Sequence, residues 1–486
     1  MSTVLISIIG SLIQMLNWRT NLIDLYSFRQ TQTAYTIREY MAGNWSFDTP
    51  LPTLGPPWNN PYEFPFFQGV AAVFGNIFGV SSDTAGRGTG FLFFLISGVL
   101  LAVLIRRWFG SKASIVSLIL FQFTPFALQW GASSLIEFAA TAFILAAIVT
   151  IEAFSRNRCW SLLILATVFL ALGFSIKITT AFAWSLVFLV AATGFAWNRR
   201  PSWLTLVIGA VPLTVALAFG MAWTRYADSI KDLNPIGTYL TSSSLQQWNF
   251  GTLLQRTNMD QWDRIFERLP SMGANLFIFI ALSIIALWRY KLDIRVFALL
   301  SVSIIAPLTF FNLFVVHSYY LAAVFPAYVA VLGIGISVIA GLVVNRIYSV
   351  VVPLVLTAAL LVLAWTSEEG LNLTTIITTE GEFPSISSAI SESVPADEGV
   401  IVIGCDWDPT PLYYAERRGM TIPPWYYDGI PVEWVGNELT YLAFCGDKYS
   451  VSDGDPSTVL PAGSQFTAIA PGIYRIVGPV KAELLR

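Results

Sequence analysis

The chain has 486 residues, of which 55% are hydrophobic and only 12% are charged, and its mean hydropathy is +0.65. Soluble domains carry roughly a quarter charged residues, so this composition argues against a soluble protein and indicates a polytopic membrane protein. The net charge is −3, but the two signs are segregated, and residues 366–486 contain 17 acidic and 6 basic side chains. Nucleic acid and anionic lipid surfaces are therefore excluded as partners of this segment.

Apolar stretches that could cross a bilayer recur along the chain, about 20 residues being needed for each crossing. We predict eleven spans, at residues 3–18, 88–105, 113–130, 137–154, 160–176, 180–197, 203–223, 273–288, 296–315, 319–341 and 349–365. Residues 66–82 are also apolar but contain several glycines, and they are interpreted as an interfacial or re-entrant piece.

Basic side chains in the short loops predict the orientation, because cytoplasmic loops are enriched in Lys and Arg. Five clusters each follow an even-numbered predicted span: Arg106, Arg107 and Lys112; Arg156 and Arg158; Arg199 and Arg200; Arg289, Lys291 and Arg295; and Arg346. The N-terminus is then cytoplasmic. The outer loops 19–87 and 224–272 and the tail face outward, which predicts a transmembrane domain, 1–365, and a soluble extracytoplasmic domain, 366–486.

The tail is predicted to be a small α/β domain. "GVIVIG" at 399–404 is typical of a buried strand, and "PLYYAERRG" at 411–419 has helical spacing and a glycine stop. "FTAIAPGIYRIVG" at 466–478 predicts one or two further strands. Cys405 and Cys445 both lie in this tail, and two interpretations stand: a disulfide or two small buried hydrophobic residues.

Charged side chains beside the spans call for a physical reason, since a charge at the bilayer centre costs at least ~2.5–3.5 kcal/mol on insertion scales. Seven lie at or near the outer ends of predicted spans: Asp24, Arg29, Glu63, Arg87, Glu137, Lys177 and His317. A transporter would place such groups near the membrane midplane. The pattern therefore favours one site on the outer side.

The stretch "DLYSFRQTQTAYTIREYM", which begins at Asp24, supplies the first candidates. Asp24 is interpreted either as a general base that deprotonates a hydroxyl or as a rim acid paired with Arg19 or Arg29. Arg29 and Gln30 begin an amphipathic helix that we expect to lie along the membrane interface. Arg29 suits a phosphate, although an arginine that reaches the headgroups is an equal alternative.

The loop "GPPWNNPYEFPFFQ" at 55–68 is rich in proline and aromatic residues. Trp58 and Tyr62 suit stacking on a sugar, but aromatic residues also mark membrane interfaces. Glu63 is the unusual acid of this loop. Glu137 opens the fourth span, where it is a second candidate acid, or it forms a capping box with Ser134.

Further along the chain, Lys177 closes the fifth span, and the only histidine, His317, begins "HSYYLAAVFP". Lys177 is interpreted as an anion ligand or as a rim charge. His317, Tyr319 and Tyr320 would bind a phosphate or have a structural role. No metal is expected, because "DWD" at 406–408 precedes Pro409 in a turn pattern and no His/Cys cluster has zinc spacing.

Taken in order over residues ~20–330, these blocks resemble the GT-C glycosyltransferases, such as lipid A aminoarabinose transferases and protein O-mannosyltransferases. "FRQTQTA" at 28–34 is similar to the "FRQ..TA" signature of a bacterial branch, and "EFPFFQ" at 63–68 is similar to its partner motif. "KITT" at 177–180 and "HSYYLAAVFP" at 317–326 match later blocks, and "PLYYAERRG" resembles members with a periplasmic domain.

The resemblance implies that an acid of the first outer loop is the catalytic base, which carries over to Asp24. Many relatives have a second acid next to it or a histidine two residues on, whereas this chain has Leu25 and Tyr26. Glu63 or Glu137 then remain as partners or substitutes.

The implied reaction moves a sugar, with inversion, from a polyprenyl-phosphate lipid to a hydroxyl of a glycan, lipid or protein acceptor. It needs no cofactor, and it takes place on the outer face of a bacterial inner membrane. The alternative is a lipid-linked sugar flippase or transporter, and a third interpretation is a scaffold without enzymatic activity.

Overall fold

A computed structural model of the protein describes residues 2–16, 18, 20–193, 203–342, 348–378, 381–423, 426 and 430–477. The basic residues Arg199, Arg200 and Arg346 and the predicted partner Arg19 lie outside these residues. The chain divides into two compact units. One comprises Met1–Arg19, Arg87–Trp223 and Leu245–Thr379, and the other comprises Thr20–Gly86, Thr224–Ser244 and Glu380–Arg486.

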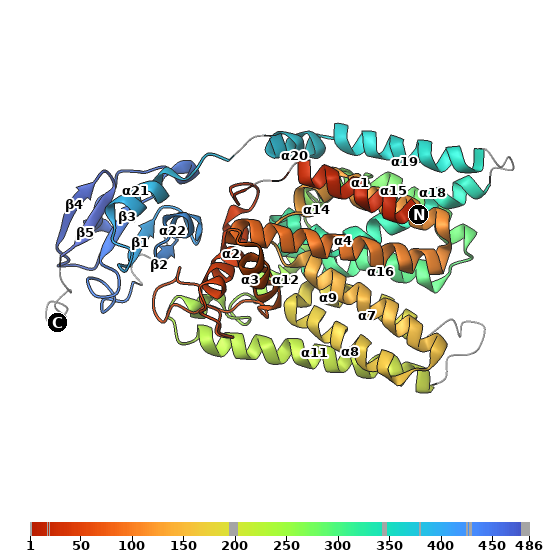
Figure 1. Ribbon diagram of the computed structural model, residues 1–486, viewed down its shortest axis with the longest axis horizontal. Coiled ribbons are helices and arrows are strands. Elements are labelled where there is room, and N and C mark those ends of the chain that lie inside the picture. Colours follow the sequence, from red (N-terminus) through yellow and green to blue (C-terminus); the bar gives the residue numbers. More distant parts are fainter. Residues whose placement is uncertain are drawn as a thin grey trace. The chain divides into compact units, whose positions relative to one another are not determined.

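The first unit is a bundle of helices that run roughly along one direction (Figure 1). The long helix α4 begins in the second unit, and α11 ends there. The main helices are α1 (Ser2–Leu16), α4 (Ser82–Phe109), α5 (Ser111–Phe123), α7 (Glu137–Asn157), α8 (Trp160–Ile176), α11 (Trp203–Lys231), α15 (Leu276–Arg289), α16 (Ile294–Thr309), α18 (Phe325–Gly341) and α19 (Tyr348–Thr366).

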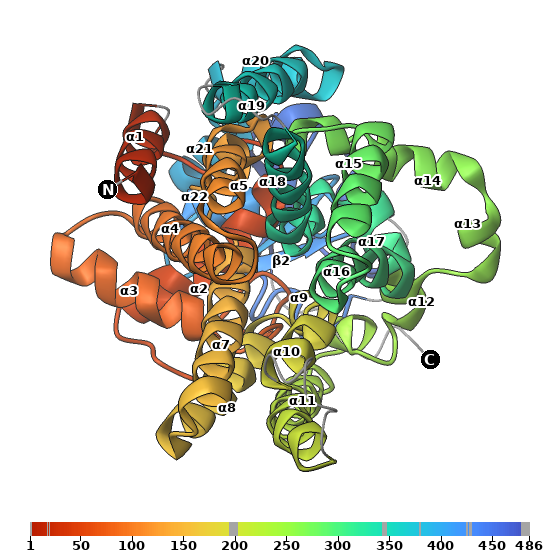
Figure 2. The same ribbon diagram turned by 90° about the vertical axis from the view of Figure 1, so that its right-hand side faces the viewer.

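Helix α18 lies inside this bundle, against α5, α15, α16 and α19 (Figure 2). It is buried along almost its whole length, and two glycines allow its close approach. A Cβ atom on Gly333 would lie 2.8 Å from the backbone nitrogen of Ser117, and one on Gly335 would lie 2.7 Å from the Cβ atom of Leu282. Packing through small residues is how apolar helices associate when lipid surrounds them.

Several predicted spans are broken into two helices. The span 113–130 consists of α5 and α6 (Pro125–Trp130), because Pro125 has no backbone N–H, and the Thr124 hydroxyl caps the new helix by accepting from Ala127 N. The other breaks separate α9 (Ile178–Ala183) from α10 (Ser185–Ala192), α16 from α17 (Phe311–Val316), and η4 (Ser318–Ala323) from α18. Because the apolar composition continues across each break, these breaks were not predicted from the sequence.

By length and composition, four helices in the described part of the chain could cross a membrane: Ser82–Phe109, Glu137–Asn157, Val207–Lys231 and Ser349–Thr366. The helices Met259–Met272 and Leu276–Arg289 meet at 69° and would make a fifth if they form one broken span. Six shorter apolar helices accompany them. The helical fold and multi-pass character agree with the prediction, but the count of eleven spans is not confirmed.

The second unit contains a five-stranded sheet of order β2-β1-β3-β5-β4. Strand β1 (Val400–Ile403) pairs in parallel with β2 (Gly419–Ile422) and β3 (Tyr441–Phe444), whereas β5 (Ile473–Ile476) is antiparallel to both β3 and β4 (Phe466–Ala470). Helices α21 (Ser385–Ser393) and α22 (Thr410–Ala415) accompany the sheet. The predicted small α/β tail, with its strand at 399–404, a helix within 411–419 and two strands near the end, is confirmed.

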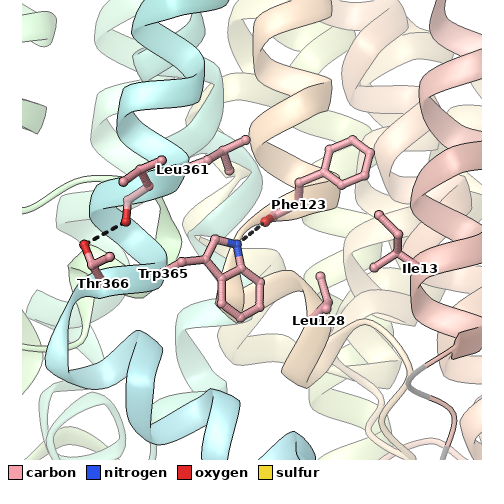
Figure 3. A pocket seen from close by; sticks show the side chains of 7 residues that line it. Ile13, Phe123, Leu128, Leu361, Trp365 and Thr366 are labelled. Carbon is pink, nitrogen blue, oxygen red and sulfur yellow. Dashed lines mark hydrogen bonds between the residues drawn. The ribbon is translucent and has the colours of Figure 1, made fainter.

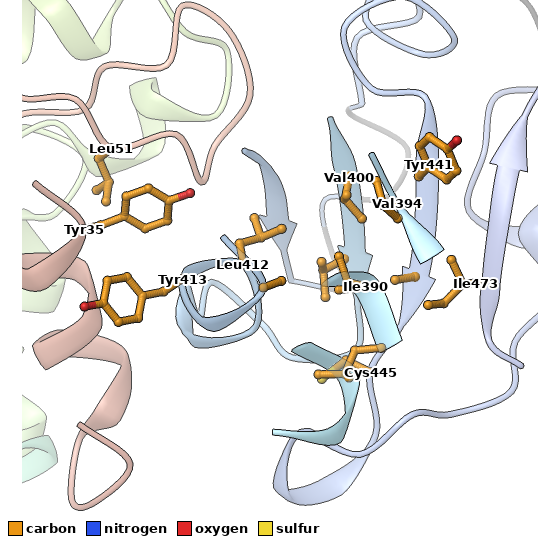
Figure 4. Packing of buried hydrophobic residues seen from close by; sticks show 14 of the residues in the cluster. Tyr35, Leu51, Ile390, Val394, Val400, Leu412, Tyr413, Tyr441, Cys445 and Ile473 are labelled. Atoms are coloured by element: carbon orange, nitrogen blue, oxygen red, sulfur yellow. The ribbon is translucent and has the colours of Figure 1, made fainter. Parts of the chain in front are cut away.

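One hydrophobic core of this unit joins the tail to the first outer loop (Figure 4). Ile390, Val400 and Leu412 share a buried cluster with Tyr35 and Leu51. A disulfide links Cys405 to Cys445, which follow the parallel neighbours β1 and β3, and their Cα atoms lie 5.6 Å apart. Of the two interpretations left open by the sequence, the disulfide is therefore the one observed.

Residues 52–55 of the first outer loop cover the edge strand β2. The backbone N–H groups of Gly419 and Thr421 donate to the carbonyls of Pro52 and Thr53, and Gly55 N–H donates to Gly419, each bond being 2.9 Å long. An uncovered edge would offer unpaired backbone groups to other chains. The predicted membrane boundary at 365/366 stays a prediction, while the packing unit joins the tail to residues 20–86 and 224–244.

Helix α2 (Ser27–Met41) is buried by protein on most of its surface, although its sequence is polar. Ser27 and Thr31 contact the tail, through Tyr449 (2.7 Å) and Thr410 (3.1 Å). On another face, the Thr36 hydroxyl donates to the carbonyl of Pro50 (3.2 Å). The position of this helix along the membrane interface stays a prediction, but hydrogen bonds within the second unit satisfy its polar side chains.

Candidate active site

The predicted site residues of the first outer loop lie around the start of α2. Tyr26, in the left-handed conformation with φ 56°, precedes the helix and turns the chain into it. The side-chain amide of Gln30 donates to the carboxylate of Asp24 and, at 3.0 Å, to the carbonyl of Leu25. Gln30 is fully buried and Asp24 is partly exposed, so the helix orients a carboxylate that solvent still reaches.

Arg29 and Glu63 form an ion pair between α2 and the loop at 55–68. The Arg29 guanidinium also donates to the side chain of Gln32, one turn further along the helix. This is the geometry in which an arginine fixes a carboxylate, since its donors are arranged in a rigid fork. The pair joins two motifs that are 34 residues apart in the sequence.

Tyr62 lies between two cations. Its ring centroid is 5.8 Å from the Arg29 guanidinium carbon and 5.1 Å from the Lys231 ammonium nitrogen. Burial raises the pKa of the Tyr62 hydroxyl well above its usual value, so this group stays a neutral hydrogen-bond donor at physiological pH.

Lys231 is a candidate that the sequence analysis missed. It ends α11, donates to the carbonyl of Leu240 at 2.9 Å and lies 3.6 Å from the carboxylate of Asp228. Its side chain is buried. The sequence signal was the position of Lys231, beyond the outer end of the predicted span 203–223. The other charged candidates were selected because they lie near the outer ends of spans in the same way.

Arg29, Tyr62 and Glu63 line a small polar cavity within the second unit. Its walls consist of Arg29, Gln32, Thr33, Thr36, Thr49, Leu51, Asn60, Tyr62, Glu63 and Gln68. Within the described part of the chain, the buried oxygens Thr49 Oγ1 and Gln68 Oε1 have no hydrogen-bond partner. Buried polar groups normally have partners, so these two atoms are suited to accept hydrogen bonds from a hydroxylated ligand or from water.

Trp58 does not present a free face to the cavity. It has a left-handed backbone with φ 72°, and the Arg418 guanidinium lies 5.1 Å from its ring centroid. The ring also packs against the hydrophobic cluster that contains Leu54 and Met420. Its predicted role in stacking on a sugar stays a prediction, but the tail already occupies part of its surface.

The remaining candidates form a second group, inside the first unit. Glu137 Oε1 lies 3.3 Å from Lys177 Nζ, and both side chains are almost completely buried. The Lys177 ammonium is 4.9 Å from the centroid of Tyr320. Helix α7 begins at Glu137 with Ile136 as its cap and no side-chain capping bond, so the capping-box interpretation with Ser134 is wrong.

Aromatic rings surround His317 in this second group. Its ring centroid lies 5.2 Å from that of Tyr319, 6.2 Å from that of Tyr320 and 5.9 Å from that of Trp248. His317 precedes η4 in an extended conformation, at the break between α17 and η4. The break thus brings a histidine and two tyrosines to the same side as Lys177.

Arg87 lies within α4, where its guanidinium donates to the carbonyl of Ala132 at 3.1 Å. This bond ties α4 to the end of α6. The structure thus assembles the predicted residues into two groups, one in each unit, and leaves the convergence of all of them on one cavity as a prediction.

No group of three or more His, Cys, Asp and Glu side chains that could hold a metal ion occurs among the residues that the structure describes. In the "DWD" stretch, Asp408 accepts hydrogen bonds from Thr410 N at 2.8 Å and from the Tyr449 hydroxyl at 2.6 Å. Burial raises the pKa of Asp408. The Asp408 carboxylate is thus engaged in hydrogen bonds within the tail.

The motif "PLYYAERRG" provides two tyrosines that hold one carboxylate. The hydroxyls of Tyr413 and Tyr414 donate to the two oxygens of Asp83, at the start of α4, and the second of these bonds is 2.9 Å long. Arg38 of α2 donates to the carbonyl of Tyr413 at 2.7 Å. The motif therefore has a structural role, because it fixes both α2 and the start of α4 within the second unit.

A separate, apolar cavity of about 450 Å³ lies in the first unit between α1, α5, α6 and α19. Figure 3 shows Ile13, Phe123, Leu128 and Leu361 around it, with the Trp365 indole donating to the carbonyl of Phe123 at 2.9 Å. Hydrocarbon walls provide no acid, base or cation for a reaction. The polar groups above are therefore the better candidates for chemistry.

Comparisons with known proteins agree with the fold described above. Residues 59–221 match the family model described as dolichyl-phosphate-mannose-protein mannosyltransferase. No curated protein sequence matches the chain significantly.

Among solved structures, ArnT from Cupriavidus metallidurans bound to undecaprenyl phosphate is similar, with a TM-score of 0.60, 14% identity, and coverage of 98% of this chain and 99% of that one. Its apo structure gives a TM-score of 0.56, 13% identity, and 98% coverage of both chains. The Archaeoglobus fulgidus oligosaccharyltransferase, in complex with zinc and sulfate, gives a TM-score of 0.58, 16% identity, and coverage of 92% of this chain and 68% of that one. At these identities the structures show a shared fold, and with the family match they confirm the resemblance to the GT-C superfamily.

Proposed function

We propose that this chain, which has the fold of the GT-C glycosyltransferases, transfers a sugar from a polyprenyl-phosphate lipid to an acceptor hydroxyl on the outer face of the membrane. The observation that carries the proposal is the polar cavity of the second unit. Arg29, Tyr62 and Glu63 line this cavity, and the buried Lys231 lies against the Tyr62 ring, all on segments predicted to face outward. A sugar attached to a phosphate requires hydrogen-bonding groups and cations together.

Asp24 is the proposed general base. Gln30 orients its carboxylate, which takes the proton of the acceptor hydroxyl. The hydroxyl oxygen then attacks the anomeric carbon, the bond between that carbon and the phosphate oxygen breaks, and the polyprenyl phosphate leaves with the electron pair. One displacement inverts the configuration at the anomeric carbon.

The cations Arg29 and Lys231 are proposed to stabilise the charge that develops on the leaving phosphate. Glu63 holds Arg29 in place through their ion pair. Lys177, His317, Tyr319 and Tyr320, with Glu137 as the acid of that group, stay candidate substrate-binding residues within the first unit. No metal enters this scheme, since fixed cations provide the positive charge.

The disulfide supports an extracytoplasmic tail, because disulfides persist in oxidising compartments and are rare in the cytosol. An outward site needs a lipid-linked donor, since nucleotide sugars are cytosolic. The proposed location is therefore the inner membrane, with the tail and both outer loops outside.

The test is transfer of radiolabelled sugars from polyprenyl-phosphate donors to candidate acceptors by the purified protein in nanodiscs. Asp24→Asn should lower the rate about 10²–10⁴-fold, the usual contribution of general base catalysis. Asp232→Asn, which alters an exposed acid of the second outer loop, is the matched control. Undiminished transfer by Asp24→Asn would remove the base assignment.

A lipid-linked sugar flippase is the alternative function. The broken helices favour it, because discontinuous helices often surround the midplane sites of transporters. Translocation of a fluorescent polyprenyl-phosphate sugar in proteoliposomes, with no sugar transfer in the nanodisc assay, would establish this alternative.

A further inference from the structure

Two adjacent leucines of the second outer loop are turned away from the protein. This part of the loop forms three short helices, α12 (Gln246–Phe250), α13 (Leu253–Thr257) and α14 (Met259–Phe266). Leu253 and Leu254 are 79% and 80% exposed, and Met259 is 63% exposed. Isolated exposed apolar side chains are ordinary, but a contiguous group marks an interaction surface.

A capping box holds α13 in this orientation. The Thr252 hydroxyl accepts from the backbone N–H of Gln255 at 3.1 Å, and the Gln255 side chain accepts from Thr252 N–H at 2.8 Å. Gln255 also donates to Asn312 at 3.1 Å, and Asn312 donates to the carbonyl of Trp248 at 2.8 Å. The leucines cannot fold inward without the loss of these bonds, so their exposure is built into the segment.

Arg256 directs the polar side of α13 toward the bundle. Its guanidinium donates to the carbonyls of Phe250 at 2.6 Å and Leu308 at 3.2 Å, and it lies 5.9 Å from the ring centroid of Phe311. The one cation of this helix is therefore engaged with α16 and α17. The outward side is left to Leu253 and Leu254.

The neighbouring helix indicates what covers these leucines. On α15, the exposed side chains are Phe277, Ile280, Ile284 and Trp288, at 80%, 45%, 60% and 66%. Their spacing of three, four and four residues places them on one helix face. An exposed apolar face on a helix of a membrane bundle is covered by lipid chains, and α13 and α14 lead directly into it along the chain.

We propose that Leu253, Leu254 and Met259 insert into the outer leaflet at the headgroup boundary, so that residues 246–266 form an interfacial membrane anchor. Amphipathic helices bind in this way, with their apolar face buried and their polar face toward water or protein. The anchor would hold the second outer loop at the membrane surface. This proposal is independent of the proposed sugar transfer.

The test measures the depth of spin labels on the full-length protein in nanodiscs of phosphatidylethanolamine and phosphatidylglycerol. Labels are attached in Leu254→Cys and, as the control on the exposed polar surface of the tail, in Glu392→Cys. Both carry Cys159→Ser, because Cys159 is an exposed free thiol. Each variant must elute and melt like its unlabelled parent.

Collisions with oxygen report lipid, and collisions with a neutral nickel complex report water. We expect the oxygen-to-nickel collision ratio of the Leu254→Cys label to exceed that of the Glu392→Cys label several-fold. Equal ratios would place the leucines in water and overturn the proposal. Exclusion of both reagents from the Leu254→Cys label would also overturn it, because protein rather than lipid would then cover the surface.

Discussion

Two of the carboxylate–cation pairs of this protein, Arg29–Glu63 and Glu137–Lys177, have similar chemistry but different surroundings. Arg29 and Glu63 join a helix to a loop at the wall of a polar cavity that contains further hydrogen-bonding groups. Glu137 and Lys177 join the start of α7 to the break between α8 and α9, where both side chains are almost fully buried. The first pair lines a small polar cavity, whereas the second is enclosed by helices.

This difference separates two uses of charge. A buried pair has lost its hydration and depends on its partner, so the loss of one member leaves an uncompensated charge. A pair at the wall of a polar cavity has further hydrogen-bonding groups beside it, and we expect it to contribute less to stability and more to recognition. We therefore expect the enclosed pair to dominate folding and the cavity groups to dominate binding.

The largest effect is expected for Glu137→Gln, which leaves the Lys177 ammonium buried without its carboxylate. The free energy of unfolding should fall by about 3–5 kcal/mol. Adding Lys177→Met should recover most of this loss, because the uncompensated charge is gone. Thermal unfolding in detergent, followed by tryptophan fluorescence, measures both, with Glu267→Gln as an exposed control. A single variant as stable as the parent would show that the pair is hydrated after all.

The second expected effect concerns binding. Lys231→Met should raise the Kd for undecaprenyl phosphate by about 10- to 100-fold, as expected for the loss of one charged hydrogen bond of roughly 1.5–3 kcal/mol. Titration calorimetry in detergent provides the measurement, and Lys291→Met on a predicted cytoplasmic loop provides the control. An unchanged Kd would take Lys231 out of the phosphate site.

A smaller effect is expected for Arg29→Lys. Arg29 donates to both Gln32 and Glu63, and a lysine keeps the charge but cannot reproduce the fork. The unfolding free energy should fall by about 1 kcal/mol, much less than for Glu137→Gln. Chemical denaturation with Arg264→Lys as an exposed control tests this order, and a larger loss than for Glu137→Gln would reverse the comparison.

The smallest effect concerns Asp408, a buried carboxylate held by hydrogen bonds from Thr410 and Tyr449. Its pKa is raised by burial, so the unfolded state loses this proton first, near pH 3.9, as the pH increases. The folded state then holds more protons, and stability should fall as the pH rises until it passes the raised pKa. Asp408→Asn should remove this fall, whereas Asp397→Asn, on the exposed surface, should retain it.

The limits of several helices and strands could be predicted from the local sequence pattern. Helix α8 has the predicted limits of 160 and 176, α7 begins at the predicted Glu137, and β1 lies within the predicted 399–404. These elements follow from apolar runs and from the residues that bound each run. Both are properties of residues that are neighbours in the sequence. The breaks at Thr124 and Phe310, inside the predicted spans 113–130 and 296–315, were not predicted, since a break requires other helices to satisfy the freed backbone groups.

The candidate site could be predicted from the sequence only in part, because it depends on contacts between residues that are distant in the sequence. Glu63 and Arg29 were each selected by charge in an apolar setting, but their pairing across 34 residues was one of several options. Lys231 was missed because its importance lies in its position beside Tyr62, which belongs to another segment.

Composition and local pattern were sufficient to indicate a helical membrane protein with a small α/β tail, because hydropathy and helix length depend on the residues of each segment alone. The burial of the polar helix α2 required the tertiary structure. Its Ser, Thr and Arg side chains are stable inside protein only because the first outer loop and the tail, up to about 420 residues away in sequence, provide the hydrogen-bond partners that lipid could not.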